Sequence, residues 1–194
     1  MKPLLKTALF MYGISLAMPV FAGNEFYLGI DSVHHSLDTS TTTWYSSVNP
    51  TSYGTAEETY HDLGLRAGYK YKSRLTDRYF WCPELSVTAL DDEFLYGTNL
   101  RLGYEFSQVE TYAVIGVSRI DKFTDNRLNY GLGLEYRVTN NTSFNIQYDV
   151  YDPIVESTES TVTIGMTTID VRTYTERRIE TLKLGFTYYF QGSK

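Results

Sequence analysis

Large apolar side chains alternate with polar or small ones along most of this chain, most clearly in its last stretch, 181–190. Every second position there is apolar: Leu182, Leu184, Phe186, Tyr188 and Phe190. A period of two predicts a β-strand with one apolar face and one mixed face. Such a stretch is also about as long as a tilted strand must be to cross a bilayer.

The same alternation predicts seven earlier strands. They are expected at 25–33, 62–71, 79–89, 94–106, 112–118, 128–138 and 144–151. In 112–118, Ala113, Ile115 and Val117 are expected to face outward, although Tyr112 and Val114 leave this register ambiguous. Pro83 cannot donate a ladder hydrogen bond, so we expect a bulge or a strand end at its position.

Long and short connections alternate between the expected strands. The connection 37–57 is rich in Ser and Thr and has no sustained period, which predicts an irregular loop. The last connection, 152–176, is also long, but Val162, Ile164 and Met166 alternate with Thr in it. Its flanking strands are therefore candidates to continue as a ribbon.

The N-terminal residues have the features of a secretory signal peptide. Lys2 and Lys6 precede an apolar stretch at 8–17, and Val20 and Ala22 are the small residues that a signal peptidase requires. We expect cleavage after Ala22. The remaining chain has 15 basic and 23 acidic side chains, a net charge of -8, which argues against nucleic acid as a partner.

The residue composition narrows the fold further. Cys82 is the only cysteine, so neither an intrachain disulfide nor a cysteine metal cluster can form. Eighteen Tyr, ten Phe and two Trp are many aromatic residues for this length, and girdles of aromatic residues are typical of membrane barrels.

The stretch 181–190 resembles the last strand of a bacterial outer-membrane β-barrel, in which an aromatic residue follows alternating apolar positions. Phe190 takes that place here, with four residues after it. Alternating long and short connections also match long outer loops and short periplasmic turns. The chain therefore resembles the small OmpA/OmpX-like and opacity-protein-like barrels.

This resemblance implies an all-β fold, an eight-stranded antiparallel transmembrane β-barrel of up-and-down topology. It would place the protein in the cell outer membrane, in contact with outer-membrane lipid, as a monomer. The expected domains are a signal peptide at 1–22, the barrel at 23–190 and a short tail at 191–194. The alternative is a soluble, lipocalin-like barrel with its apolar face inside.

Size favours the membrane barrel, because eight strands enclose a lumen just wide enough to be filled by side chains. Small and charged residues share one face, and we expect them to line this lumen. The charged set is Asp62, Arg66, Lys70, Glu84, Arg101, Glu105, Glu135, Arg137, Asp149 and Lys183. Unpaired buried charges are costly, so these residues are expected to form a salt-bridged plug. A gated pore that opens by re-pairing them is the alternative.

The three histidines are the remaining candidates for chemistry. His34 and His61 point the same way by parity, so a surface metal site is conceivable, as is a Ser/His pair with Ser32 or Ser36. The sequence has no carboxylate at a spacing that would orient such a pair. We therefore expect no catalytic site, no metal and no cofactor.

The expected function is that of a bacterial surface protein with a structural or adhesin role through its extracellular loops. Candidate loop contacts are Trp44, Tyr45, Tyr53, Ile164, Met166 and Ile169. The ligand would be a host or other cell-surface molecule. A small porin-like diffusion channel is the alternative, and an outer-membrane lipid-modifying enzyme is less favoured.

Overall fold

The computed structural model describes residues 24–46, 52–73, 78–90, 93–121, 126–164 and 167–191. Its strands are β1 (Glu25–Tyr45), β2 (Ser52–Lys72), β3 (Tyr79–Leu90), β4 (Glu93–Phe106), β5 (Val109–Ile120), β6 (Arg127–Arg137), β7 (Thr142–Tyr151), β8 (Ile154–Ile164) and β9 (Thr167–Gln191). Within these residues, no helix is long and apolar enough to span a membrane. The expected signal peptide lies outside the described residues, as do 192–194, whereas Gln191 still belongs to β9.

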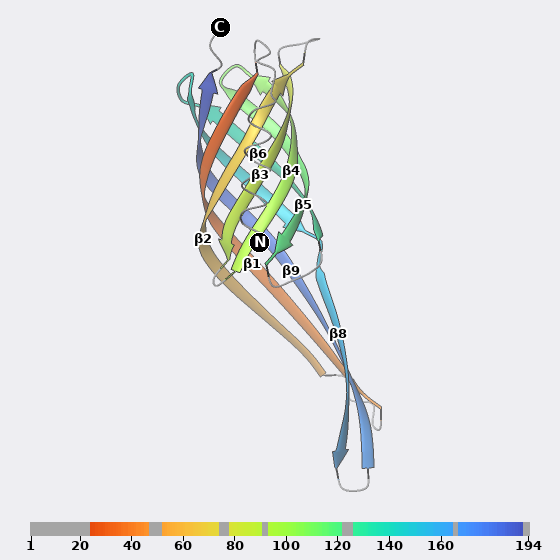
Figure 1. Cartoon of the computed structure of the whole chain (residues 1–194). Coiled ribbons are helices and arrows are strands. Elements are labelled where there is room, and N and C mark those ends of the chain that lie inside the picture. The colour runs from red at the N-terminus through yellow and green to blue at the C-terminus, as the bar shows by residue number, and fades with distance from the viewer. Residues whose placement is uncertain are drawn as a thin grey trace, which may run out of the picture.

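The strands form a closed barrel (Figure 1). Each of β1 to β7 pairs antiparallel with the next, β7 pairs with β9, and β9 closes the ring by pairing with β1. β8 pairs with β9 beyond the end of β7, so β7 and β8 follow one path that Asp152 and Pro153 interrupt. The barrel therefore has eight strands in up-and-down order, as the sequence predicted.

The two ends of the barrel differ. The two-residue turn between β4 and β5 and the turn at 138–141 lie where β1 begins and β9 ends. Outer-membrane barrels have short turns on the periplasmic side and long connections outside. We therefore assign this end to the periplasm and the opposite end to the cell exterior.

Four strands continue past the barrel on the extracellular side. β1 and β2 stay paired as far as Thr43 and Ser52, and β1 and β9 as far as Tyr45 and Val171. With β8 on the outer edge of β9, the strands make one projecting sheet in the order β2, β1, β9, β8, which we call the extracellular sheet (Figure 1).

The extracellular sheet corrects one sequence prediction and extends another. The expected irregular loop at 37–57 is wrong, since 37–43 and 52–57 lie in the β1–β2 ladder. Within 152–176, the suggested ribbon is present as β8 paired with β9. The period of two does not show at 37–57 because polar residues occupy both faces of the strands. The many Thr residues of this segment nevertheless favour extended backbone.

Side chains of the barrel alternate between the two faces as the sequence predicted. Outward-facing Leu132 is 70% exposed and Ile115 is 57% exposed, while Tyr112 and Val114 are buried inside. This resolves the ambiguous register of β5. The barrel thus has an apolar outer surface and a polar interior, the reverse of the soluble lipocalin-like alternative.

Pro83 does not end β3. Its pairing with β4 continues opposite Leu100. The ladder to β2 skips two positions there, but Gly68 pairs with Glu84 and Tyr71 with Trp81 in one unshifted register. The expected bulge is therefore wrong: the missing N–H of proline costs local pairing on one side only.

Candidate functional site: the lumen and the extracellular sheet

Side chains fill the lumen in layers. Nearest the periplasmic end, Arg137 pairs with Glu25 at 2.9 Å and with Glu110 at 3.2 Å. Lys70 contacts Glu110 and lies 3.5 Å from Glu105. Glu105 is also 3.0 Å from Lys72. This first layer is a ladder of ion pairs that includes partly exposed members, as expected near a mouth of the barrel.

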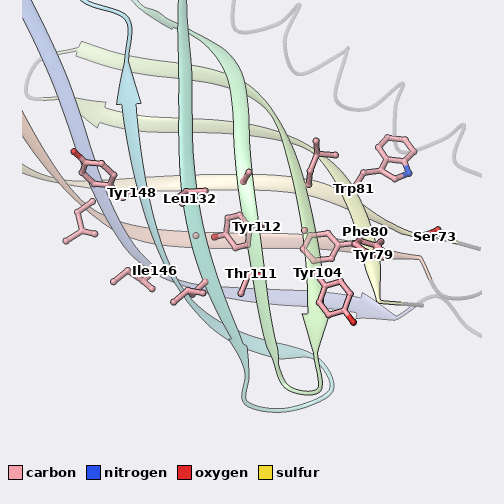
Figure 2. Close-up of a pocket in the computed structure, with 16 residues that line it drawn as sticks. Ser73, Tyr79, Phe80, Trp81, Tyr104, Thr111, Tyr112, Leu132, Ile146 and Tyr148 are labelled. Carbon is pink, nitrogen blue, oxygen red and sulfur yellow. The ribbon is translucent and has the colours of Figure 1, made fainter. Parts of the chain in front are cut away.

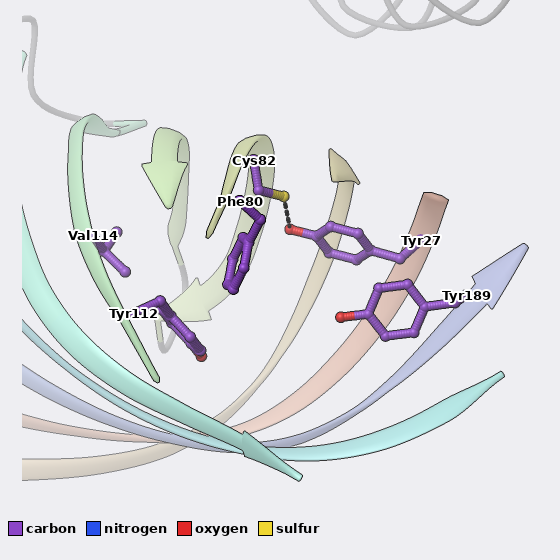
Figure 3. Close-up of a cluster of buried hydrophobic side chains, with 6 residues drawn as sticks. All are labelled: Tyr27, Phe80, Cys82, Tyr112, Val114 and Tyr189. Carbon is purple, nitrogen blue, oxygen red and sulfur yellow. Dashed lines mark hydrogen bonds between the residues drawn. The ribbon is translucent and has the colours of Figure 1, made fainter. Parts of the chain in front are cut away.

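An aromatic layer follows. It consists of Tyr27, Phe80, Cys82, Tyr112, Val114 and Tyr189, which are packed together and buried (Figure 3). The Cys82 thiol donates to the Tyr27 hydroxyl over 3.2 Å, and that hydroxyl donates to Glu84 over 2.7 Å. The guanidinium of Arg137 lies 4.0 Å from the centre of the Tyr189 ring. Aromatic rings thus fill the lumen and also interact with its cations.

Arg101 occupies the middle of the lumen and is only 2% exposed. Its guanidinium is 2.9 Å from Glu135 and 3.4 Å from Glu84, and it stacks 3.7 Å from the centre of the Tyr112 ring. Glu135 also accepts hydrogen bonds from the hydroxyls of Ser143 and Tyr189. Glu84 and Glu135, the two carboxylates that pair with Arg101, therefore each have a further hydrogen-bond partner.

Arg66 forms the next layer towards the exterior. It is 3.2 Å from Asp31 and 3.7 Å from Glu84, so Glu84 lies between two arginines. One of its terminal nitrogens donates to Asn145 and, over 2.6 Å, to the Thr187 hydroxyl. Beyond Arg66, Lys183 forms a 2.7 Å ion pair with Asp149. The Asp149 carboxylate also accepts a hydrogen bond from the Gln147 amide.

The lumen charge network therefore differs in membership from the set expected from sequence. Nine of the ten expected residues lie in these layers: Arg66, Lys70, Glu84, Arg101, Glu105, Glu135, Arg137, Asp149 and Lys183. Asp62 has no ion pair among the described contacts, and one of its carboxylate oxygens is buried without a hydrogen-bond partner. Asp31, Glu110 and Glu25 belong to the network although sequence reasoning left them out.

Two of these omissions had a visible signal. Asp31 stands two residues after Gly29 on the inward face of the first expected strand. Glu110 lies between the strands expected at 94–106 and 112–118, whereas β5 begins at Val109, which places Glu110 inside. Counted with Lys72, the described part of the network has six cations and seven carboxylates. The set expected from sequence had five of each, so the described network has a small acidic excess.

An apolar cluster lies at the extracellular end of the lumen. Leu95, Ile120, Tyr151, Ile154 and Ile179 are all buried there, and Leu37 packs against them. We call this cluster the extracellular cap. The sequence did not predict this cluster, because its members come from six strands and several of them lie in connections that were expected to be loops.

The extracellular sheet carries most of the expected loop contacts. Trp44 and Tyr45 are exposed near the tip of β1, and Tyr53 at the start of β2 is 77% exposed. Ile169 is half-buried in β9, Ile164 ends β8, and Met166 lies outside the described residues. Trp44 meets Tyr174 edge-on, with ring centres 6.5 Å apart.

A hollow lies beside this aromatic pair. It has a volume of about 670 Å³ and is bordered by Trp44, Tyr45 and Ser46 on one side, and by β8 and β9 residues including Glu159, Asp170 and Arg172 on the other. Its mixture of aromatic and charged side chains suits recognition of a polar ligand.

A second depression is of a different kind. It is an apolar groove of about 1020 Å³ whose walls include the outward-facing Leu102, Tyr104, Leu132 and Tyr148 (Figure 2). It exists because Thr111 and Ala113 of β5 are smaller than their neighbours on β4 and β6. The groove lies on the apolar outer surface, where lipid chains would fill it.

The histidines divide between the two faces. His34 and His61 face each other across β1 and β2 on the outer surface, with their Nδ1 atoms 3.3 Å apart. His35 is buried inside, 2.9 Å from the Thr181 hydroxyl. Among the described residues, no group of three or more His, Cys, Asp or Glu side chains is arranged to hold a metal ion.

Comparison with known proteins agrees with the architecture. No family model matches the chain, and no curated protein does. Among solved structures, the outer membrane protein OprG from Pseudomonas aeruginosa superposes with a TM-score of 0.50 at 13% identity, over 87% of this chain and 97% of that one. The fold is that of a small outer-membrane barrel.

Two further structures are similar at lower scores. Neisserial surface protein A gives a TM-score of 0.40 at 17% identity, over 87% of this chain and 98% of that chain. Ail, the attachment invasion locus protein of Yersinia pestis, gives 0.35 at 14% identity, over 84% and 99%. At these identities the likeness concerns fold alone.

The location follows from the barrel itself. Its outer surface exposes Leu, Phe and Tyr side chains around the ring, and its interior holds charges that are buried and paired. In lipid, only helices and closed barrels satisfy every backbone polar group. This protein is therefore an outer-membrane β-barrel protein, inserted through the apolar belt that its strands share.

Proposed function

We propose that this barrel is an anchor for a cell-surface interaction, and that the extracellular sheet is its contact surface. The observation that carries the proposal is the sheet itself: four strands project beyond the barrel and present exposed aromatic residues, among them Trp44, Tyr45 and Tyr53. Aromatic side chains dominate binding at interfaces because they bury large areas at little entropic cost. The proposed ligand is a host or other cell-surface molecule.

The lumen supports an anchor more than a channel. Arg101, Arg66 and their carboxylate partners cross its centre, and the extracellular cap packs apolar side chains at its outer end. Opening a path would require buried ion pairs to separate, which costs several kcal/mol. A diffusion channel is the competing function.

The test is a truncation that keeps the barrel. Replacing 40–55 and 157–174 each by an Asn-Gly turn joins residues that are already paired, Thr39 with Ala56 and Glu156 with Thr175. Adhesion of expressing bacteria to cultured epithelial cells and to abiotic polystyrene would be measured for both forms. We expect the truncated protein to lose adhesion, with equal amounts of folded barrel at the surface.

A milder variant separates side chains from the whole sheet. Trp44→Ser with Tyr53→Ser should reduce adhesion, whereas Thr55→Ser, on the same strand as Tyr53, should not. Adhesion that is unchanged by both the truncation and the aromatic substitutions would remove the proposal.

A further inference from the structure

The outward-facing pair of His34 and His61 has the geometry of a metal chelate. The two residues stand directly opposite each other in the β1–β2 ladder. Their ring centres are 4.5 Å apart and their Nδ1 atoms 3.3 Å apart. Two nitrogens that are bound to one tetrahedral ion at about 2.0–2.1 Å are separated by about 3.3 Å. The backbone register thus sets the spacing that the ion needs.

The pair lies where the apolar belt ends. On β1 the outward positions are Phe26, Leu28 and Ile30, followed by Ser32 and His34. On β2 they are Leu65 and Leu63, followed by His61. His34 is half-buried and His61 is exposed, so an ion can reach both rings from the water side of the interface.

We propose that His34 and His61 bind one divalent transition-metal ion, such as Cu²⁺ or Zn²⁺, on the extracellular rim of the barrel. Imidazole suits these ions, and affinity for a nitrogen site rises to Cu²⁺ in the first-row series. Two protein ligands leave the other coordination positions to water. This inference does not depend on the proposed adhesive function.

The third histidine provides a matched control. His35 is adjacent in sequence to His34, but it faces the lumen and contacts Thr181. The chain has three histidines in all. A substitution of each by glutamine therefore separates the chelating pair from the remaining imidazole.

The experiment uses the whole barrel, purified without a histidine tag, in detergent micelles. Cu²⁺ is titrated by calorimetry, and the bound ion is examined by electron paramagnetic resonance. We expect one ion per chain and a spectrum with two imidazole nitrogens. His34→Gln and His61→Gln should each weaken Cu²⁺ binding by about tenfold or more and leave one imidazole in the spectrum. Substitutions next to a metal ligand already cost about tenfold, so loss of a ligand should cost at least as much. His35→Gln should bind like the unmodified protein.

The structural alternative is a hydrogen bond between the two rings with no affinity for metal. Thermal unfolding with and without Zn²⁺ separates metal binding from a simple hydrogen bond. Zn²⁺ should raise the unfolding midpoint of the unmodified barrel, and it should not change the midpoint of the double variant that carries His34→Gln and His61→Gln. Copper bound with equal affinity in that double variant, or a wild-type spectrum with one nitrogen, would overturn the proposal.

Discussion

Arg101 is the residue on which most of the lumen charge network depends. It contacts two carboxylates, Glu84 and Glu135, and stacks on Tyr112. Removing one member of a buried pair costs more than the pair contributes, because the remaining charge stays buried and uncompensated. The network is therefore stable as a whole and sensitive to each substitution.

We predict that Arg101→Ala lowers the free energy of unfolding of the barrel by about 3–5 kcal/mol. The control is Arg172→Ala, which removes an ion pair of similar length, 2.7 Å to Glu159, on the exposed extracellular sheet. That pair is screened by water and should have little effect. Urea unfolding in micelles, followed by tryptophan fluorescence, measures both. Equal effects of the two substitutions would show that the lumen pairs are solvated.

Glycine makes room for the aromatic layer. A Cβ atom on Gly133 would lie 2.2 Å from Cζ of Tyr112, the ring on which Arg101 stacks. The sequence showed glycines on the inward face, but it could not show which ring each one accommodates.

Gly133→Ala should therefore destabilise the barrel by about 1–3 kcal/mol, the usual cost of overpacking. Gly54 is a matched control, because a Cβ atom there meets nothing within 4 Å. Chemical unfolding of the two alanine variants provides the comparison. If Gly133→Ala were as stable as Gly54→Ala, the Tyr112 ring could move aside and the packing of this layer would be loose.

At the scale of whole elements, the barrel and the extracellular sheet are separable. On the periplasmic side of Val33 and Asp62, every strand has two neighbours in the ring. On the extracellular side, β8 and the first half of β2 have one described neighbour each. Glu57, Glu58, Glu156 and Glu159 place charges on these two edges, which discourages pairing between sheets of different molecules.

The truncation that removes 40–55 and 157–174 should leave the unfolding midpoint of the barrel unchanged. It retains Leu37, Ile154 and Ile179 of the extracellular cap, so the mouth keeps its packing. Heat-modifiable gel mobility and chemical unfolding measure this. A truncated protein that no longer folds would show that the sheet contributes to the barrel and is not a separate element.

The sequence predicted the barrel strands well and the extracellular strands poorly, for one physical reason. In the membrane, one face meets lipid and the other meets charges, so Leu128 to Val138 alternates strictly. In water the two faces of the extracellular sheet are alike, and Thr39 to Thr43 carries no such signal. The inward position of Arg101 followed from alternation, but its partners across the lumen depend on barrel closure.

At the scale of the molecule, three groups of packed side chains lie in series along the lumen. They are the periplasmic ion pairs with the aromatic layer, the central arginines, and the extracellular cap. An anchor for the extracellular sheet needs a stable, filled barrel, and a diffusion channel needs an open one. The central claim is therefore that the lumen is closed.

Planar-bilayer recording tests this claim most directly. The account predicts little steady conductance for the unmodified barrel. It also predicts a measurable increase for Arg101→Ala or Glu135→Gln, since an unpaired lumen charge draws in water. A large and stable conductance in the unmodified protein, insensitive to both substitutions, would contradict it and would make the protein a channel.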